Sequence, residues 1–128
     1  MLTTAQLNIE NYDDNKRLQY LLNEAVVHNQ LWILTDEHGC MMLNSEEEDC
    51  IPIWPNKEFA LQWVNNDWQH CQPEAISLNK WFSRWTQGLI EDDLAIVVFP
   101  NHAEQGLILY PDELDYELKQ KQKILAST

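Results

Sequence analysis

Cysteine and histidine are the residue types in this sequence best suited to bind a metal ion or to act as nucleophiles. The candidates that we consider are Cys40, Cys50, Cys71, His38, His70 and His102. Structural zinc sites need such ligands at short, regular spacings, for example two cysteines separated by two residues. No such spacing occurs here. We therefore expect no metal site and no cofactor, and thiols that pack as small apolar groups.

Serine and paired carboxylates offer a second route to catalysis. Ser45 and Ser83 lie in no nucleophile motif, and Ser77 is better placed to cap a helix. The pair Asp92 and Asp93 could act as general acid and general base, but a turn between a helix and a strand explains the two adjacent aspartates more simply. With three glycines in the chain, no loop has the composition that cradles phosphate. The sequence therefore favours a non-enzymatic role.

Aromatic residues are concentrated in the middle of the chain, where all six tryptophans fall between positions 32 and 85. Trp63, Trp81 and Trp85 lie at helical spacing, which favours burial in the core. Trp54 lies between Pro52 and Pro55 and Trp68 precedes a loop, so their environment is less determined. Packing is favoured for both, and exposure at an interface is the alternative.

An acidic segment lies directly before this aromatic junction. Glu46, Glu47 and Glu48 are adjacent like charges, which predicts a solvated loop. A charged rim beside an aromatic anchor is typical of protein-binding surfaces. The candidate partner-binding residues are therefore Trp54, Pro55, Trp68, Glu46, Glu47 and Glu48.

The overall charge narrows the classes of partner. Twenty-one acidic residues against eight lysines and arginines give a net charge of −13 and a pI near 4.4. Nucleic acids and anionic membranes are bound through clustered cations, so neither is expected as a partner. The expected partner is a protein with a basic face. The first residues do not form a signal peptide, which predicts a cytoplasmic protein with reduced cysteines.

Periodicity and turn residues predict the elements that hold these side chains in place. Apolar residues at helical spacing predict helices over residues 13–29, 56–68, from residue 77 to about 89, and from residue 111 onward. Strand-forming runs predict a hairpin of residues 31–36 and 40–44, a short strand at 51–54, and a second hairpin of 94–99 with 107–110. Residues 69–75 are expected to be a loop. The uninterrupted apolar run 94–99 predicts the most deeply buried strand.

These elements predict one α+β domain over residues 1–128. Its sheet is expected to be mostly antiparallel, with about five strands and helices packed on it, in the order α-ββ-β-α-α-ββ-α. Residues 1–11 are expected to form a loose arm. Residues 119–128 are expected to fray at the end of the last helix.

Several ordered motifs in the chain resemble a known bacterial family. They are IPIWP at residues 51–55 with Ala60, ISL at 76–78 with Phe82 and Trp85, and VVFP at 97–100 with Gly106 and Leu114. In this order they resemble the family called domain of unknown function 2750. Trp32, Leu34, Asp36 and Gly39 are similar to its opening hairpin. The resemblance implies no catalytic residues, because none is assigned to that family. At the level of element order, the chain also resembles the amino-terminal domain of SseB-type proteins, whose relatives include accessory and toxin-immunity proteins.

Two functional hypotheses follow. The favoured one is a non-catalytic accessory module, immunity-like in the sense of that distant resemblance, which binds another protein. The alternative is a small enzyme or ligand-binding domain with a pocket near Trp54, Trp68 and Asp92. The sequence does not identify the partner or the oligomeric state.

Overall fold

A computed structural model describes residues 4–9, 11–37, 39–44, 49–64, 68–100 and 106–127. The helices are α1 (Thr4–Ile9), α2 (Asp14–His28), α3 (Lys57–Leu61), α4 (Leu78–Lys80), the π-helical turn η2 (Trp81–Trp85), α5 (Thr86–Glu91) and α6 (Pro111–Ala126). The strands are β1 (Gln30–Asp36), β2 (Gly39–Cys40), β3 (Leu43–Asn44), β4 (Asp49–Ile53), β5 (Gln72–Ser77), β6 (Ala95–Val98) and β7 (Leu107–Leu109). The α+β class is confirmed.

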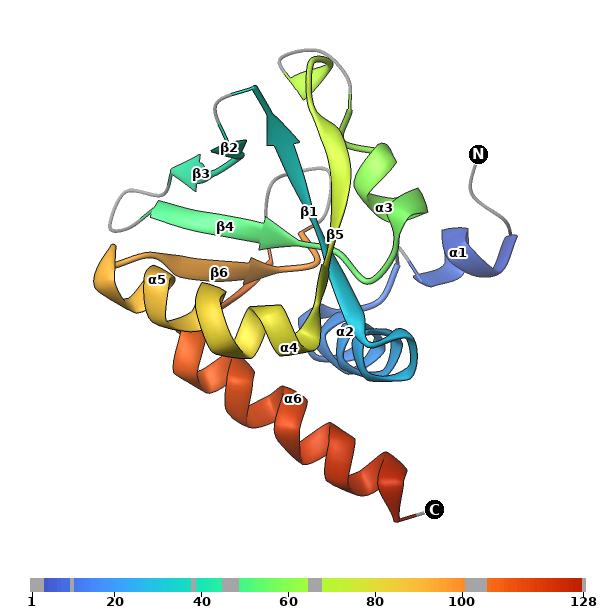
Figure 1. Ribbon diagram of the computed structural model, residues 1–128. Coiled ribbons are helices and arrows are strands. Elements are labelled where there is room, and N and C mark those ends of the chain that lie inside the picture. Colours follow the sequence, from blue (N-terminus) through green and yellow to red (C-terminus); the bar gives the residue numbers. More distant parts are fainter. Residues whose placement is uncertain are drawn as a thin grey trace.

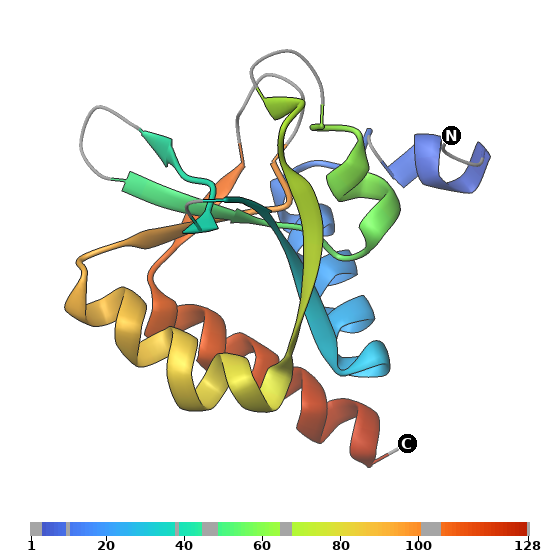
Figure 2. The same ribbon diagram turned by 45° about the horizontal axis from the view of Figure 1, so that its top comes forward.

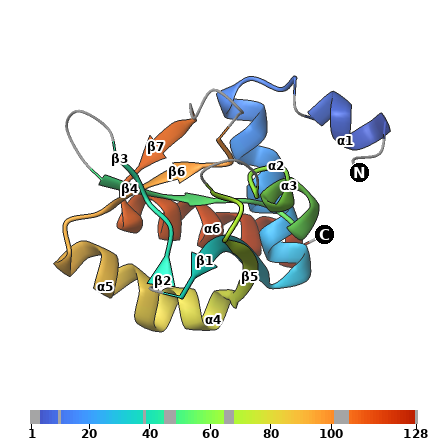
Figure 3. The ribbon, with the colours of Figure 1, turned by 90° about the horizontal axis from the view of Figure 1, so that it is seen from above.

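The strands form two sheets, so the prediction of one five-stranded antiparallel sheet is wrong. One sheet has the order β2-β1-β5, and the other has the order β3-β4-β6-β7. In the second sheet β4 and β6 are parallel, whereas the other neighbouring strands are antiparallel. The strands of the two sheets cross steeply, and α6 and the α4–α5 stretch lie below them (Figures 1 and 2). Seen from above, α2 lies beside β6, near the carboxyl end of β4 (Figure 3).

The error arose mainly at residues 72–77, because we expected residues 69–75 to be a loop. They form β5, which pairs with β1 along six residues. Apart from Ile76, which is buried, β5 is exposed or half-buried, so it carries no hydrophobic period that could mark it as a strand. Pro73 lies on an edge strand, where a missing N–H is tolerated.

The first predicted hairpin is correct only in part. β1 pairs with β2 over two residues, and β3 then leaves to pair with β4 in the other sheet. The second hairpin is confirmed, because β6 pairs antiparallel with β7. All four residues of β6 are buried, and the strand lies between β4 and β7, as its apolar run predicted.

The predicted helices are present, but two have other limits. α2 is capped by Asp13, whose carboxylate accepts a hydrogen bond from the Lys16 N–H at 2.9 Å. α3 begins after its cap Asn56 as expected, yet it ends at Leu61 instead of continuing to Trp68. Residues 4–9 of the expected arm form α1, and α6 continues through Lys119 and Lys123 to Ala126.

A reciprocal pair of backbone hydrogen bonds joins the two sheets. The N–H of Trp32 donates to the carbonyl of Trp54 at 3.1 Å, and the N–H of Trp54 donates to the carbonyl of Trp32 at 2.9 Å. The side chain of Trp54 is 0% exposed and belongs to the main hydrophobic core. The residue that follows β4 is thus fixed both through its backbone and through its ring.

The buried residue Arg17 fixes the end of β6. Its Nε donates to the Phe99 carbonyl at 2.8 Å, and its Nη2 donates to the Pro100 carbonyl at 3.1 Å. The guanidinium also lies 3.8 Å from the centre of the Phe99 ring. Phe99 has a φ of 44°, in the left-handed region that non-glycine residues rarely adopt. These bonds hold the chain in that turn as it leaves the sheet.

Candidate functional site

The aromatic residues proposed from the sequence as partner anchors lie mainly inside the protein. Trp54 and Pro55 are buried, so neither side chain is available to a partner in this structure. The Trp54 ring packs 5.6 Å from the Trp63 ring, which in turn lies 5.7 Å from the half-buried ring of Trp68. The three rings form a row from the core toward the surface. Trp54 is therefore a packing residue, the alternative that the sequence favoured.

The acidic part of that proposed surface, Glu46, Glu47 and Glu48, lies outside the described residues. Asp49, the next residue, begins β4 and is exposed. The alternative pocket near Trp54, Trp68 and Asp92 stays a prediction. Asp92 lines a pocket whose described lining residues do not include Trp54 or Trp68.

Among the cysteine and histidine residues that the structure describes, His70 and Cys71 both lie near Asp36. No group of three metal-ligating side chains occurs within the described ranges. His70 Nε2 lies 3.4 Å from Asp36 Oδ2, at the end of β1. Cys71 is 5% exposed, and burial together with the nearby Asp36 raises the pKa of its thiol. A thiol with a raised pKa stays protonated and is a poor nucleophile.

A candidate site is a groove between the α4–α5 stretch and the end of the four-stranded sheet. Its volume is about 250 Å³. We call it the α5 groove. Its lining residues are Ile51, Lys80, Arg84, Trp85, Gly88, Leu89, Asp92 and Leu94. Ile51 and Leu89 are buried and Leu94 is half-buried, which gives an apolar floor, while the charged side chains are exposed at the rim.

The helical stretch that forms one wall of this groove is continuous but not regular. The Ser77 hydroxyl accepts a hydrogen bond from the Lys80 N–H at 3.2 Å and starts α4, as predicted. Residues 81–85 then form the π turn, in which the Thr86 N–H bonds to the Trp81 carbonyl five residues earlier. Such turns are rare, and they occur frequently at functional sites.

A second element holds the π turn in place. The Thr86 hydroxyl lies 3.2 Å from the Trp81 carbonyl and 2.7 Å from Asp115 Oδ1 on α6. Burial raises the pKa of Asp115, while its hydrogen bond from Thr86 and the charge of Lys119 act in the opposite direction. The Trp81 ring is fully buried and stacks on the half-buried Trp85 ring, with centroids 5.6 Å apart and planes 10° apart. Trp85, which lines the groove, is therefore held in place by its stacking on the buried Trp81 ring.

The amino acid sequence matches one known family. Residues 18–118 match the family described as protein of unknown function (DUF2750). The chain belongs to this family. Comparison with curated proteins and with solved structures gave no match. The likeness of this DUF2750 chain to SseB-type proteins therefore stays a prediction.

The groove of this DUF2750 chain was missed at the sequence level because its residues have other good explanations. Trp85 was assigned to the core by its helical spacing, and it does contact the core with part of its ring. Gly88 was noted only as one of three glycines. A signal was present, however: Lys80, Arg84, Gly88 and Asp92 recur at intervals of four, so that a glycine lies within a row of charged residues.

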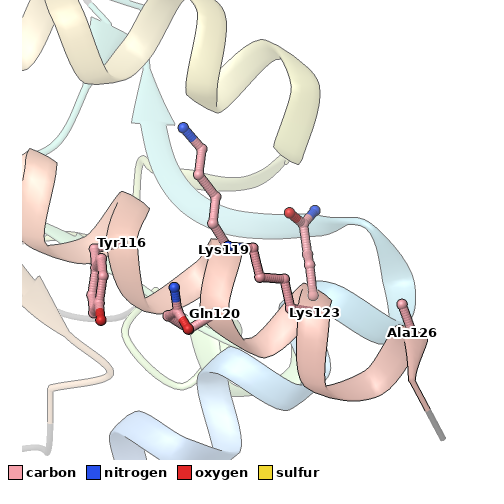
Figure 4. Close-up of a pocket in the computed structure, with 6 residues that line it drawn as sticks. Tyr116, Lys119, Gln120, Lys123 and Ala126 are labelled. Carbon is pink, nitrogen blue, oxygen red and sulfur yellow. The ribbon is translucent and has the colours of Figure 1, made fainter.

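A second hollow, of about 620 Å³, lies along α6 of this DUF2750 chain. Figure 4 shows Tyr116, Lys119, Gln120, Lys123 and Ala126 on this helix, with Lys119 reaching toward the neighbouring helical stretch. Lys119 Nζ lies 5.0 Å from the centre of the Phe82 ring. All described lining residues come from one helix, so the hollow has no opposing wall among them. No helix in the described part of the chain is long and apolar enough to cross a membrane.

Proposed function

We propose that this chain is a non-catalytic accessory module that binds another protein through the α5 groove. The observation that carries the proposal is Gly88. A Cβ added to Gly88 meets no atom within 4 Å, and its φ lies outside the left-handed region. Glycine inside a helix is less favourable than alanine by about 0.5 to 1 kcal/mol. Folding alone therefore gives no reason for a glycine here, whereas a bound partner that approaches the helix backbone does.

The π turn supports the same conclusion independently. It replaces regular α-helical hydrogen bonds by a rarer pattern, and it lies directly before Gly88 in the wall of the groove. Two local features that weaken a helix are thus found on one surface. Natural sequences depart from local structural preferences mainly at functional sites.

The shape and chemistry of the groove favour a protein partner over a small molecule. Ligand pockets usually enclose about 300 to 1,000 Å³. The α5 groove, at about 250 Å³, is below this range. Its apolar floor, half-exposed tryptophan and charged rim have the composition of a protein-binding hot spot. Asp92 is the only carboxylate among the described lining residues, and no histidine or cysteine lines the groove with it.

We propose that the partner presents a basic face. The net charge of −13 favours such a protein during diffusion. Glu91, Asp92 and Asp93 are exposed at the carboxyl end of α5, where the groove ends. As the compartment we propose the bacterial cytoplasm, whose reducing conditions suit the buried cysteines Cys50 and Cys71.

The test is affinity capture of partners by the wild-type chain and by two leucine variants. Gly88→Leu fills the groove with a side chain, and we expect it to abolish capture. The matched control is Gln87→Leu, because Gln87 is exposed on the same helix and does not line the groove. We expect the control to capture the same partner as wild type. Equal capture by both variants, with circular dichroism showing both folded, would overturn the proposal.

A further inference from the structure

The charged residues of the α5 groove follow a regular order along its helical wall. The row consists of Lys80, Arg84, Gly88 and Asp92. In a helix each step of four residues advances by about 6 Å along the axis. Two positive charges therefore precede the bare backbone of Gly88, and a negative charge follows it. The apolar floor lies beside the middle of this row.

The π turn helps to keep this row on one side of the helix. Four residues of an α-helix turn by about 400°, so each step of four drifts by about 40°. A π turn has more residues per turn and rotates less per residue, which offsets the drift between Lys80 and Arg84. This gives the irregular turn a geometric role in the site.

An extended peptide has almost the same repeat as this row. Strands rise by about 3.3 Å per residue, and alternate side chains face the same way, so side chains on one face repeat every 6.6 Å or so. Residues i, i+2 and i+4 of such a peptide would lie opposite Arg84, Gly88 and Asp92. The charges then fix which side chain suits each position.

We infer that the α5 groove binds an extended segment of the partner with the pattern acidic-x-apolar-x-basic. The acidic side chain accepts hydrogen bonds from Arg84 and Lys80, neither of which makes an ion pair with another described residue. The apolar side chain enters the groove over Gly88 and against Trp85. The basic side chain pairs with Asp92. This inference rests on the proposed function and names the ligand class of the same groove.

The probe is the synthetic peptide acetyl-Glu-Ala-Leu-Ala-Lys-amide, titrated into the full chain labelled with ¹⁵N. We expect saturable amide shifts in residues 84–92. A peptide with glutamine at both charged positions should bind about fivefold or more weakly, because two exposed ion pairs are lost. A serine in place of the leucine should weaken binding further, since the groove is then left partly empty.

Charge reversal makes the inference specific. Arg84→Glu should lose affinity for the probe and regain it for a peptide that carries lysine in place of the glutamate. Lys57→Glu is the matched control, because Lys57 is exposed on α3 and lies outside the groove, and its affinity for the probe should equal that of wild type.

Each failure has a distinct meaning. Equal binding of the charged and glutamine peptides would overturn the ligand class and leave the groove as a binding site. The absence of saturable shifts in residues 84–92 would overturn the peptide inference. The proposed function would then be tested only by the affinity-capture experiment with Gly88→Leu. A dimeric mass in solution that falls to that of a monomer in Gly88→Leu would show that a second copy of the chain occupies the groove, and would also overturn the inference.

Discussion

Two pairs of tryptophans in this protein have the same separation but different surroundings. The rings of Trp54 and Trp63 are 5.6 Å apart, and so are the rings of Trp81 and Trp85. The first pair is buried on both sides, with Trp68 packed on its outer ring. In the second pair one ring is buried and the other lines the α5 groove. Ring contact alone therefore does not distinguish a core residue from a binding residue; the space beyond the second ring does.

The largest effect in this comparison is expected for Trp54→Ala. It removes a fully buried indole from the core, and such truncations cost about 3 to 5 kcal/mol of folding free energy. Urea unfolding should show this loss. Trp68→Ala should cost much less, because Trp68 is half-buried at the end of the row. Comparable losses for both variants would mean that the row does not run from core to surface.

A smaller loss of stability, about 1 kcal/mol, is expected for Trp85→Ala, because only part of that ring is buried. Partner binding should nevertheless be lost, since the ring forms a wall of the groove. Calorimetry with the peptide probe and thermal unfolding of the same sample separate the two effects. A variant that binds normally would remove Trp85 from the site and leave the groove to its charged residues.

Gly88→Ala should change stability in the opposite direction, by increasing it. The new Cβ meets nothing within 4 Å, so the variant should gain about 0.5 to 1 kcal/mol of stability from the better helix propensity of alanine. At the same time it should bind the peptide probe more weakly, because the methyl group takes space over the groove. A stability gain together with a binding loss is not expected of a residue that serves folding only. Loss of both would show that Gly88 is needed by the fold.

Much of the fold could be predicted from local signals. The helix starts at Asp13, Asn56 and Ser77 were predicted correctly, and the apolar run at residues 94–99 identified the buried strand. Each of these signals depends on a few neighbouring residues. The three-stranded sheet could not be predicted in this way, because β5 is held by backbone pairing with β1 and buries one side chain, Ile76.

The groove was less predictable than the fold for a related reason. Its floor combines Ile51 from β4 with Leu94, and these residues meet only because β4 and β6 pair in parallel across a long connection. Local periodicity carries no information about such a pairing. Of the described residues that we proposed from the sequence for either hypothesis, Asp92 alone lines the groove.

The smallest expected effect concerns Asp115, which helps to hold the Trp81–Trp85 pair in place. Asp115 accepts a hydrogen bond from Thr86, which also bonds to the Trp81 carbonyl. Because burial raises the pKa of Asp115, the folded state binds its proton more tightly than the unfolded state does. Its contribution to stability therefore decreases as the pH rises through the folded-state pKa, and the full penalty is present above that pKa.

Asp115→Asn removes this titration and keeps an oxygen that can accept from Thr86. We expect the variant to be slightly more stable than wild type at pH 7, by about 0.5 kcal/mol or less. The difference should shrink as the pH is lowered toward 4, because wild-type Asp115 then becomes protonated in the folded state. Thermal unfolding of both proteins across this range measures the difference directly. A difference that grows on acidification would mean that the fold stabilises the carboxylate, and the support of the Trp81–Trp85 pair would then depend on its charge.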